Sequence, residues 1–373
     1  MRSFVLFWAS CWSVFAFLFL PFTYNFIPNI GIGLSTFILP VNKEVCSWFG
    51  VEIQETYLIS DSLAFYSTAF ILLLFSGLIS GVISWKYKSV IPKIQKVILG
   101  LMVLLLAFFL IRYGLDKLFN RQFYTPASNT LHTPTGQLSK DILFWSSMGT
   151  SSFYNAFMGI AEVITGILLL FNRTRFLGLL LAFGILGNIL GVNIGFDITV
   201  KYLSGLLLLT SVICLFFYGD RLKALITEER VEKVTPILSK VWILILFPLF
   251  FVDLVMTYWE NPKNESGSSY QVHSIGSESD LIDEVEIVRI HFHPSGYFIT
   301  EDKQQRFASF KMSPDRKYVI VKQQFIPISI MDNQLVWNEG GEDVCWELKE
   351  IDLEKMSLKQ DEVNWYFESI GEY

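Results

Sequence analysis

The stretch Tyr154–Leu170, YNAFMGIAEVITGILLL, decides the fold class of this 373-residue chain. Nearly all of it suits a helix in lipid, and its length approaches the roughly 20 residues that a bilayer crossing needs. One acidic residue, Glu162, interrupts it. A charge at the centre of a bilayer costs at least about 2.5 kcal/mol, so Glu162 needs a partner, a proton or a functional role. The stretch predicts a membrane helix that carries a polar site.

The composition indicates a membrane protein with two unlike parts. Hydrophobic residues make up 52% of the chain, which is typical of membrane proteins. Residues 1–262 carry 18 Lys and Arg against 14 Asp and Glu, whereas residues 263–373 carry 11 against 21. Binding to phosphate backbones requires a basic surface, so the acidic C-terminal part argues against a nucleic-acid partner.

Seven apolar runs predict an all-α polytopic membrane helix bundle over residues 1–260, with the lipid bilayer as its surroundings. The spans are expected near residues 4–21, 62–85, 97–117, 151–171, 176–196, 200–219 and 239–258. The first run is interpreted as a retained anchor, because Leu20–Thr23 offers no small-residue cleavage site. In the outer segments, a short interfacial helix is expected near 35–49, and Phe144 and Trp145 are suited to the headgroup level.

The basic residues predict an orientation for these spans. If the N-terminus is inside, 12 of the 18 Lys and Arg of the membrane part fall in cytoplasmic segments and 6 do not, as the positive-inside rule requires. The C-terminal part then lies outside the cytoplasm. The expected location is the plasma (inner) membrane of a bacterium.

From Glu284 onward, continuous apolar runs give way to alternation of apolar and polar residues. Six short runs separated by turn signals predict a small antiparallel β domain over 284–373, a barrel or a sandwich of about six to eight strands. Residues 261–283, rich in Ser, Gly and acidic residues, are expected to form a linker. His291 and His293 alternate onto one strand face, which suits either two metal ligands or, without an evident third ligand, a plain half-buried strand.

The polar residues of the predicted spans are biased toward their outer halves. This bias predicts a polar pocket between the helices that opens outward. We expect Glu162 and Arg112 to be its catalytic pair, and the ligand-binding candidates are Asn155, Asp116, Lys117, Asn188, Asn193 and Asp253. The alternative is that the buried charges only hold the helices in register.

Helical periodicity places Asn155, Gly159, Glu162 and Gly166 on one face. The two glycines make a groove that a neighbouring helix or a ligand can approach closely. Among the predicted partners of Glu162, Arg112 is preferred, because its long side chain can reach inward. The repeat of Gly187, Gly191 and Gly195 is typical of tight packing between membrane helices.

The phrases RYGLDKLFNRQF and FMGIAEVITGILLLFNRTR, followed by a glycine-rich span, resemble the four-helix DoxX/DoxD membrane family over roughly residues 94–220. The shared pattern is a Gly-x-x-Lys, a Gly-x-x-Glu-x-x-x-Gly helix and a Thr-Arg turn, here Gly114, Lys117, Gly159, Glu162, Gly166, Thr174 and Arg175. The resemblance implies a four-helix core. It also implies an association with thiosulfate:quinone oxidoreduction, thiol-redox complexes or membrane-protein handling.

Two functions therefore remain open. The first is an oxidoreductase component in which the pocket binds a quinone or a small sulfur compound and Glu162 relays a proton. The second is a non-catalytic scaffold or small-molecule carrier whose β domain docks an extracytoplasmic protein partner. Four cysteines without a Cys-x-x-Cys count against intrinsic disulfide exchange. Cys46 and Cys345, both outside under this topology, are candidates for a disulfide.

Overall fold

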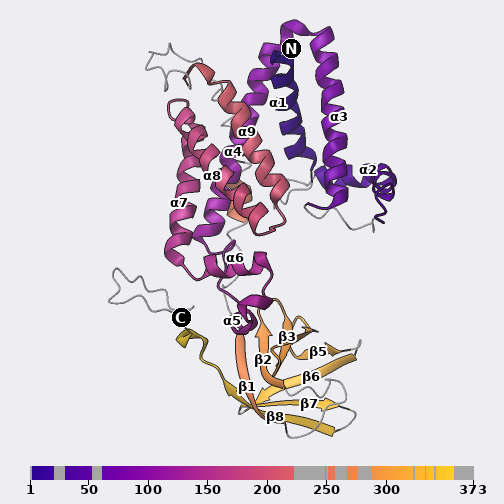
Figure 1. Cartoon of the computed structure of the whole chain (residues 1–373), viewed down its shortest axis with the longest axis vertical. Helices are drawn as coiled ribbons and strands as arrows, with labels where there is room; N and C mark the ends of the chain where they lie inside the picture. The colour runs from indigo at the N-terminus through magenta and orange to yellow at the C-terminus, as the bar shows by residue number, and fades with distance from the viewer. Residues whose placement is uncertain are drawn as a thin grey trace. The chain divides into compact units, whose positions relative to one another are not determined.

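The fold is described from a computed structural model (Figure 1) for residues 2–20, 30–52, 61–221, 248, 251–256, 267–275, 287–321, 324–331, 333–339 and 342–356. The chain divides into two compact units. The bundle comprises Met1–Leu118 and Phe157–Pro262, and the barrel unit comprises Phe119–Ala156 and Lys263–Tyr373. The predicted bundle of 1–260 is therefore too inclusive, because 119–156 forms a compact unit with the C-terminal domain.

The described part of the bundle contains long apolar helices. They are α1 (Arg2–Phe19), α2 (Ile30–Ser47), α3 (Leu63–Lys86), η1 (Lys88–Val90), α4 (Ile91–Leu118), α7 (Ser152–Leu170, whose first turn lies in the barrel unit), α8 (Arg175–Gly195) and α9 (Lys201–Phe216). Four stretches are long and apolar enough to cross a membrane, namely α3, η1 with α4, α7 and α8. The apolar helices Phe4–Leu18 and α9 are shorter. Most of the predicted seventh span, 239–258, lies outside the described residues, although 251–256 is helical.

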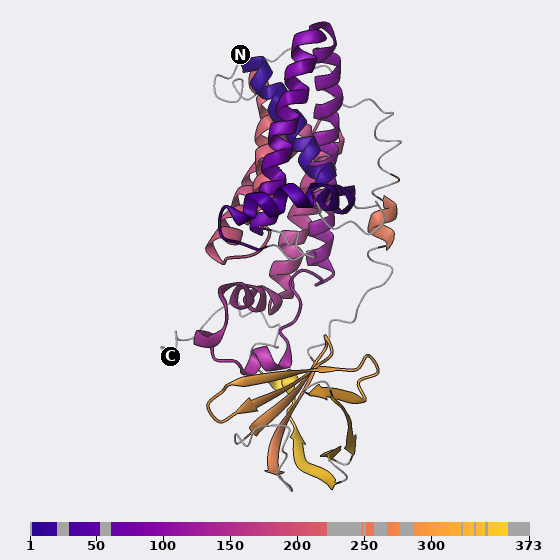
Figure 2. The ribbon, with the colours of Figure 1, turned by 90° about the vertical axis from the view of Figure 1, so that its right-hand side faces the viewer.

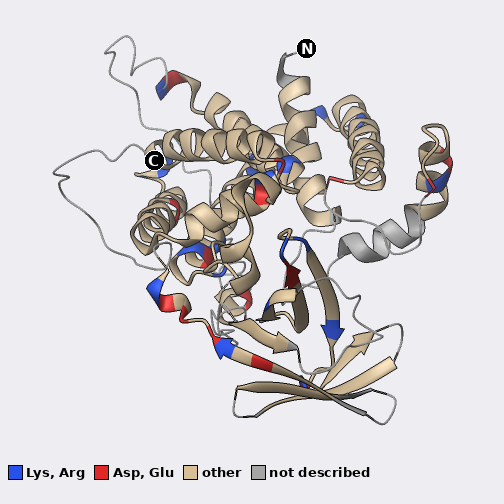
Figure 3. Ribbon diagram, turned by 60° about the horizontal axis from the view of Figure 1, so that its bottom comes forward, with Lys and Arg blue, Asp and Glu red and all other residues tan. Residues whose placement is uncertain are grey.

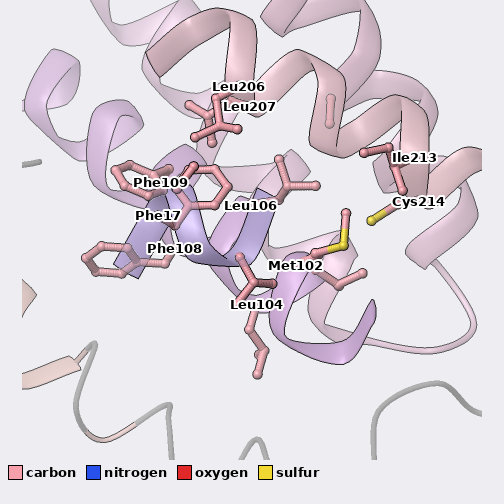
Figure 4. Close-up of a cluster of buried hydrophobic side chains, with 14 of the residues drawn as sticks. Phe17, Met102, Leu104, Leu106, Phe108, Phe109, Leu206, Leu207, Ile213 and Cys214 are labelled. Carbon is pink, nitrogen blue, oxygen red and sulfur yellow. The ribbon is translucent and has the colours of Figure 1, made fainter. Parts of the chain in front are cut away.

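Side chains of several helices form one apolar core in the bundle. Phe17 of α1 lies against Phe109 of α4, with ring centroids 5.4 Å apart, and Leu206 and Leu207 of α9 belong to the same cluster (Figure 4). Short polar contacts join the same helices, such as the 2.6 Å hydrogen bond between Ser13 of α1 and Thr210 of α9. Hydrogen bonds of this kind help membrane helices to associate, because lipid offers no competing partner.

The lipid-facing surface is clearest on α7. Its exposed large side chains recur every three or four residues, and they are Phe153, Phe157, Ile160, Ile164, Ile167 and Phe171 just beyond its end. The opposite face carries Asn155, Gly159, Glu162 and Gly166, all buried, so the predicted polar face is confirmed. Figure 3 shows how sparsely charged residues are distributed along the helical ribbons. A helix with this pattern satisfies lipid on one side and the protein interior on the other.

The predicted interfacial helix near 35–49 is longer than expected and begins at Ile30. Its C-terminal part is held against α3 by a buried amide: Asn42 Nδ2 donates to Thr68 Oγ1 at 2.8 Å, and Asn42 Oδ1 accepts from Ser67 Oγ at 2.9 Å. Just beyond α2, Trp48 and Phe49 are exposed, and large amphipathic rings of this kind favour a membrane–water interface.

The C-terminal domain is a closed barrel in which each strand pairs antiparallel with the next and β8 pairs with β1 (Figure 2). The strands are β1 (Ser268–Ile275), β2 (Ile287–His293), β3 (Tyr297–Asp302), β4 (Phe307–Met312), β5 (Tyr318–Val321), β6 (Gln324–Met331), β7 (Gln334–Glu339) and β8 (Glu342–Glu350). Alternate residues fill the lumen, including Trp337 and Trp346, whose ring centroids are 4.9 Å apart. The predicted antiparallel β domain is confirmed, and the barrel alternative holds.

The sequence patterns did not predict two of the strands. β6 contains Pro327, which lacks the N–H of a ladder residue and makes a run look unlike a strand. β1 lies inside the predicted 261–283 linker, so that prediction is wrong for Ser268–Ile275. Gly267 precedes β1 with φ +78°, and a Cβ there would lie only 2.1 Å from the Phe292 carbonyl oxygen. That glycine permits a close backbone approach to β2.

The segment between α4 and α7 completes the barrel unit. It contains α5 (Ser128–His132), η2 (Thr135–Gln137) and α6 (Lys140–Gly149), and α5 packs on β1 and β2 (Figure 1). Phe144 and Trp145, which were predicted to suit the headgroup level, both lie on α6. The Phe144 and Trp145 rings pack on Phe123, at 5.9 Å and 5.1 Å between centroids, and both residues are half-buried. Their position at the headgroup level stays a prediction.

All four cysteines are free, so the suggested Cys46–Cys345 disulfide is not formed. Cys46 is fully buried on α2, in the bundle. Cys345 lies on β8 in the barrel unit, half-buried and next to the inward-facing Trp346. The two thiols therefore belong to different compact units, which is what spacing along a sequence cannot reveal.

Candidate functional site

The two motif helices, α4 and α7, touch backbone to backbone. A Cβ added to Gly159 would lie 2.6 Å from the Gly114 carbonyl oxygen, and one added to Gly114 would lie 2.7 Å from the Gly159 carbonyl oxygen. Farther along, a Cβ on Gly166 would lie 2.6 Å from a side-chain carbon of Ile111. The groove predicted beside Glu162 is therefore filled by a neighbouring helix, the first of its two expected occupants.

This contact brings two motif charges together. Lys117 is one turn beyond Gly114, and Glu162 is one turn beyond Gly159. Side chains on a helix lean toward its N-terminus, so in this antiparallel crossing each charge leans back toward the glycine contact. Lys117 Nζ lies 2.9 Å from both carboxylate oxygens of Glu162, and the side chains are 4% and 0% exposed. The two short motifs thus form one structure.

The predicted Glu162–Arg112 pair is not formed, because Arg112 pairs with Asp253 instead. Arg112 Nη1 lies 2.7 Å from Asp253 Oδ2, and the side chains are 12% and 0% exposed. The physical reason lies in the helical period. Ile111 of α4 faces α7, and Arg112 is rotated by about 100° from it, toward a different neighbour. The structure therefore combines predicted site residues in two separate ion pairs.

The remaining candidates are dispersed. Asn155 Nδ2 donates weakly to Asn120 Oδ1 at 3.3 Å and to the Phe123 carbonyl at 3.4 Å. Asn193 Nδ2 donates to Ser204 Oγ at 3.0 Å and thereby joins α8 to α9. Asn188 is exposed on α8, and its expected position near Glu162 stays a prediction. Asp116 is half-buried on α4, between the two ion-paired positions of that helix.

The glycine repeat of α8 also behaves differently from the prediction. Within the described residues, a Cβ on Gly187, Gly191 or Gly195 would meet nothing within 4 Å, so tight packing occurs at the α7 glycines instead. A repeat of small residues permits close packing of a helix, but the tertiary structure decides whether a neighbouring helix lies against that repeat.

Two structural residues were missed. Arg175 is fully buried and caps the C-terminus of α7: its Nε donates to the Leu169 carbonyl at 2.9 Å, and Thr174 Oγ1 donates to the Leu168 carbonyl at 2.8 Å. The Thr-Arg turn in the sequence could have predicted this capping role, because the last carbonyl groups of a helix have no partners within the helix. Asp61 caps α9 from a distance, accepting from the Lys201 and Tyr202 backbone N–H groups at 2.7 and 3.0 Å.

The central pair can hold or exchange a proton. In its ionised form Lys117 neutralises Glu162, and in a proton-shifted form both groups are neutral. Lys117 Nζ lies 2.9 Å from Oε1 of Glu162 as well as from Oε2, but it is aligned for a hydrogen bond to Oε2 alone, so Oε1 has no hydrogen-bond donor among the described residues. An acceptor of this kind can take a donor from a bound molecule, but it is equally compatible with an ion pair that only locks the two helices.

The comparisons with known proteins leave the family open. No family model and no solved structure matches the chain. The chain is similar to the uncharacterised protein YwoB of Bacillus subtilis (strain 168), with 29% identity over 138 residues, which are 35% of this chain and 82% of that protein. The name of that protein states no activity, so the similarity brings no function to this chain.

Proposed function

We propose that this chain is a non-catalytic membrane scaffold or carrier whose barrel docks a protein partner outside the cytoplasm. One observation carries the proposal: the loop 119–156, which joins two membrane-spanning helices, forms a compact unit with the barrel. Because this loop belongs to the compact unit of the barrel, that unit is connected along the chain to the predicted spans at both ends of the loop as well as through the segment before β1. A folded unit with several connections to a membrane part is suited to presenting a partner at the membrane.

The barrel offers a candidate docking surface on β5 and β6. Tyr318 pairs with Pro327 and Ile320 pairs with Phe325 across these strands. Their neighbours Val319, Val321 and Ile326 belong to the lumen core, so this set points outward. Tyr318 is 39% exposed and Phe325 is 65% exposed. Exposed aromatic side chains on a rigid sheet are typical of the centres of protein–protein interfaces.

Site-specific photocrosslinking in living cells tests this function. A photoreactive amino acid at Phe325 is expected to give a discrete crosslinked product of one mass, whereas the same group at exposed Lys349 on β8 gives none. Replacing Tyr318 with Ser in the Phe325 reporter should reduce the product at least severalfold. Equal products from both positions, or none from Phe325, would contradict a specific partner on this surface.

The proposed side of the membrane has its own test. The excess of basic residues supports an N-terminus in the cytoplasm and a barrel outside it. Reporter fusions after Tyr87, Arg173 and Tyr373 are expected to report inside, inside and outside. A cytoplasmic signal at Tyr373 would move the docking partner into the cytoplasm and would contradict the prediction that the pocket opens outward.

A second candidate function rests on the Oε1 atom of Glu162, which lies 2.9 Å from Lys117 Nζ and, in the part of the chain that the structure describes, has no aligned hydrogen-bond donor. The resemblance to DoxD proteins implies a quinone or a small sulfur compound, and a hydroquinone hydroxyl would supply the missing donor. Gentle purification followed by absorbance and mass analysis should then recover a quinone with the wild-type protein. The matched Glu162→Gln variant should lose it. A folded wild-type protein without any quinone or sulfur compound would leave the scaffold as the better account.

A further inference from the structure

A buried polar chain lies on the outer wall of the barrel, where exposure is expected. Ile290 belongs to the lumen core, so its neighbour His291 points outward, directly opposite Ser269 of β1. Nevertheless Ser269, His291 and Glu301 are all 0% exposed. Side chains on the outside of a small barrel become buried only when another segment covers them. That segment is α5, which packs on β1 and β2 (Figure 1).

The covered residues form a continuous hydrogen-bonded chain. Ser269 Oγ lies 2.7 Å from His291 Nδ1, and His291 Nε2 lies 3.2 Å from Glu301 Oε2. The other carboxylate oxygen of Glu301 accepts from Arg289 Nη1 at 2.6 Å. With Glu301 ionised, His291 carries a hydrogen on Nε2, and Nδ1 can accept from the Ser269 hydroxyl. Every polar group of the chain therefore has a partner without help from α5.

His132 is the titratable residue with which α5 covers this chain. Its ring centroid lies 5.1 Å from that of His291, and its Nδ1 lies 2.8 Å from the Ser128 carbonyl oxygen of its own helix. Ser128 Oγ also donates, at 3.4 Å, to the Ser268 carbonyl at the start of β1. The α5 segment thus adds one imidazole ring, tilted by 47° from the His291 ring, and one long hydrogen bond to a wall whose polar groups already have partners.

A proton on His132 meets an unfavourable set of charges. The charged and titratable groups that face it are His291 and Arg289 from β2 and Glu301 from β3. Glu301 attracts this proton, but Arg289 is already hydrogen-bonded to that carboxylate, and the positive charge of Arg289 opposes the proton. Protonated His132 would sit against the basic side of this chain, with its own charge partly removed from water.

We propose that α5 and the wall of β1–β3 form a pH-sensitive latch, which holds the 119–156 loop on the barrel while His132 is neutral and releases it when His132 is protonated. The latch controls whether the 119–156 loop is packed on the barrel. This proposal does not depend on which partner or ligand the protein binds. Once released, α5 would uncover Ser269, His291 and Glu301 to solvent.

The direction of the pH effect follows from linkage. Burial lowers the pKa of His132 below its ordinary 6.5. The charges of a protonated His291 and of Arg289 act in the same direction, and the Ser128 hydrogen bond and Glu301 act against them. The released state therefore binds protons more readily than the docked state. Docking is fully supported above about pH 6.5 and weakens as the pH falls from there toward the lowered value. Each unit of lowering corresponds to about a tenfold change in the docking equilibrium.

Hydrogen–deuterium exchange of the full chain in nanodiscs tests the latch. The amides of 128–133 are followed at pH 7.5 and 5.5, with rates divided by the intrinsic exchange rate at each pH. Their protection is expected to fall severalfold or more at pH 5.5, whereas that of the central strands β2 and β3 stays constant. In His132→Phe, which keeps an aromatic ring but cannot titrate, protection of the same amides should no longer depend on pH.

His293→Gln is the matched control. His293 lies on the same strand as His291, and burial lowers the pKa of its imidazole too, but its Nδ1 accepts from the Ser295 backbone N–H. This variant should keep the pH dependence of wild type. Protection of 128–133 that is equal at both pH values in wild type, or a pH dependence that survives in both His132→Phe and His132→Gln, would overturn the latch.

Discussion

The bundle and the barrel unit each bury a glutamate beside a basic side chain, but they satisfy it differently. Among the described residues, Glu162 has one cationic partner, Lys117, whose Nζ lies 2.9 Å from both of its oxygens and is aligned for a hydrogen bond to Oε2 alone. Glu301 has two partners, one on each oxygen, and both come from the adjacent strand β2. The barrel thus surrounds its carboxylate with a redundant network, whereas the bundle depends on one contact between two helices. A single substitution should therefore be far more damaging in the bundle.

Removing the cation of the bundle should have the largest effect. In Lys117→Met, Glu162 keeps its buried position and loses its only described partner, which is expected to lower the free energy of unfolding by about 3–5 kcal/mol. Thermal unfolding in a mild detergent measures the change. Adding Glu162→Gln should recover part of the loss, because no uncompensated charge then remains. A double variant as unstable as Lys117→Met would show that the pair is not the source of the effect.

The helix crossing itself should be the next most sensitive feature. Gly159→Ala places a methyl group 2.6 Å from the Gly114 carbonyl oxygen, so α4 and α7 must separate, at an expected cost of about 1–3 kcal/mol. Gly191→Ala is the matched change on α8, where nothing lies within 4 Å of the added carbon. It should be neutral or slightly stabilising, because alanine favours a helix by up to about 1 kcal/mol over glycine. Equal losses from both would contradict the close crossing.

A substitution in the redundant network of the barrel should lower the free energy of unfolding by less. Glu301→Gln removes charge-assisted hydrogen bonds from Arg289 and His291, at an expected cost of about 1–3 kcal/mol at pH 7.5. Burial alone would raise the pKa of Glu301, but hydrogen bonds from His291 and Arg289 outweigh it and hold the pKa below its ordinary 4.5. The stabilisation is therefore present above about pH 4.5 and is lost as the pH falls through the lowered value. Unfolding curves of variant and wild type should converge at low pH.

The smallest effect is expected at Asn188, which is exposed on α8. Asn188→Leu should change the stability of the protein by no more than about 0.5 kcal/mol, as is usual for a surface position. The same unfolding assay measures it. A loss above 2 kcal/mol would mean that Asn188 has a structural partner after all and would make the candidate site larger than the two ion pairs, on the order expected for a buried hydrogen bond.

Much of the architecture was readable because hydrophobic patterning acts locally. The apolar runs predicted α3, α4, α7 and α8, and the alternation after Glu284 predicted most of the barrel strands. The polar face of α7 also followed from its period alone. β1 and β6 were missed, since one lies in a Ser- and Gly-rich segment and the other contains Pro327. The existence of seven spans and their orientation stay predictions.

The partners within the candidate site were less accessible. The sequence nominated Arg112, Lys117, Glu162 and Asp253, and all four are engaged in ion pairs. The predicted pairing of Arg112 with Glu162 rested on the length of the arginine side chain. It did not take into account which face of α4 carries Arg112. Which face of α4 meets α7 depends on the glycine contact, and two residues five positions apart point about 140° away from each other. Pairing is therefore a property of the crossing and not of either helix.

By itself, the sequence determined that this chain has helices long and apolar enough to cross a membrane, an antiparallel β domain after them, and a carboxylate within one of those helices. Each of these follows from period and polarity along one segment. Only the tertiary structure decided that Lys117 neutralises Glu162, that the 119–156 loop belongs with the barrel and that α5 covers His291. These are contacts between segments far apart in the chain. Their energies depend on distance and burial, which no local pattern encodes.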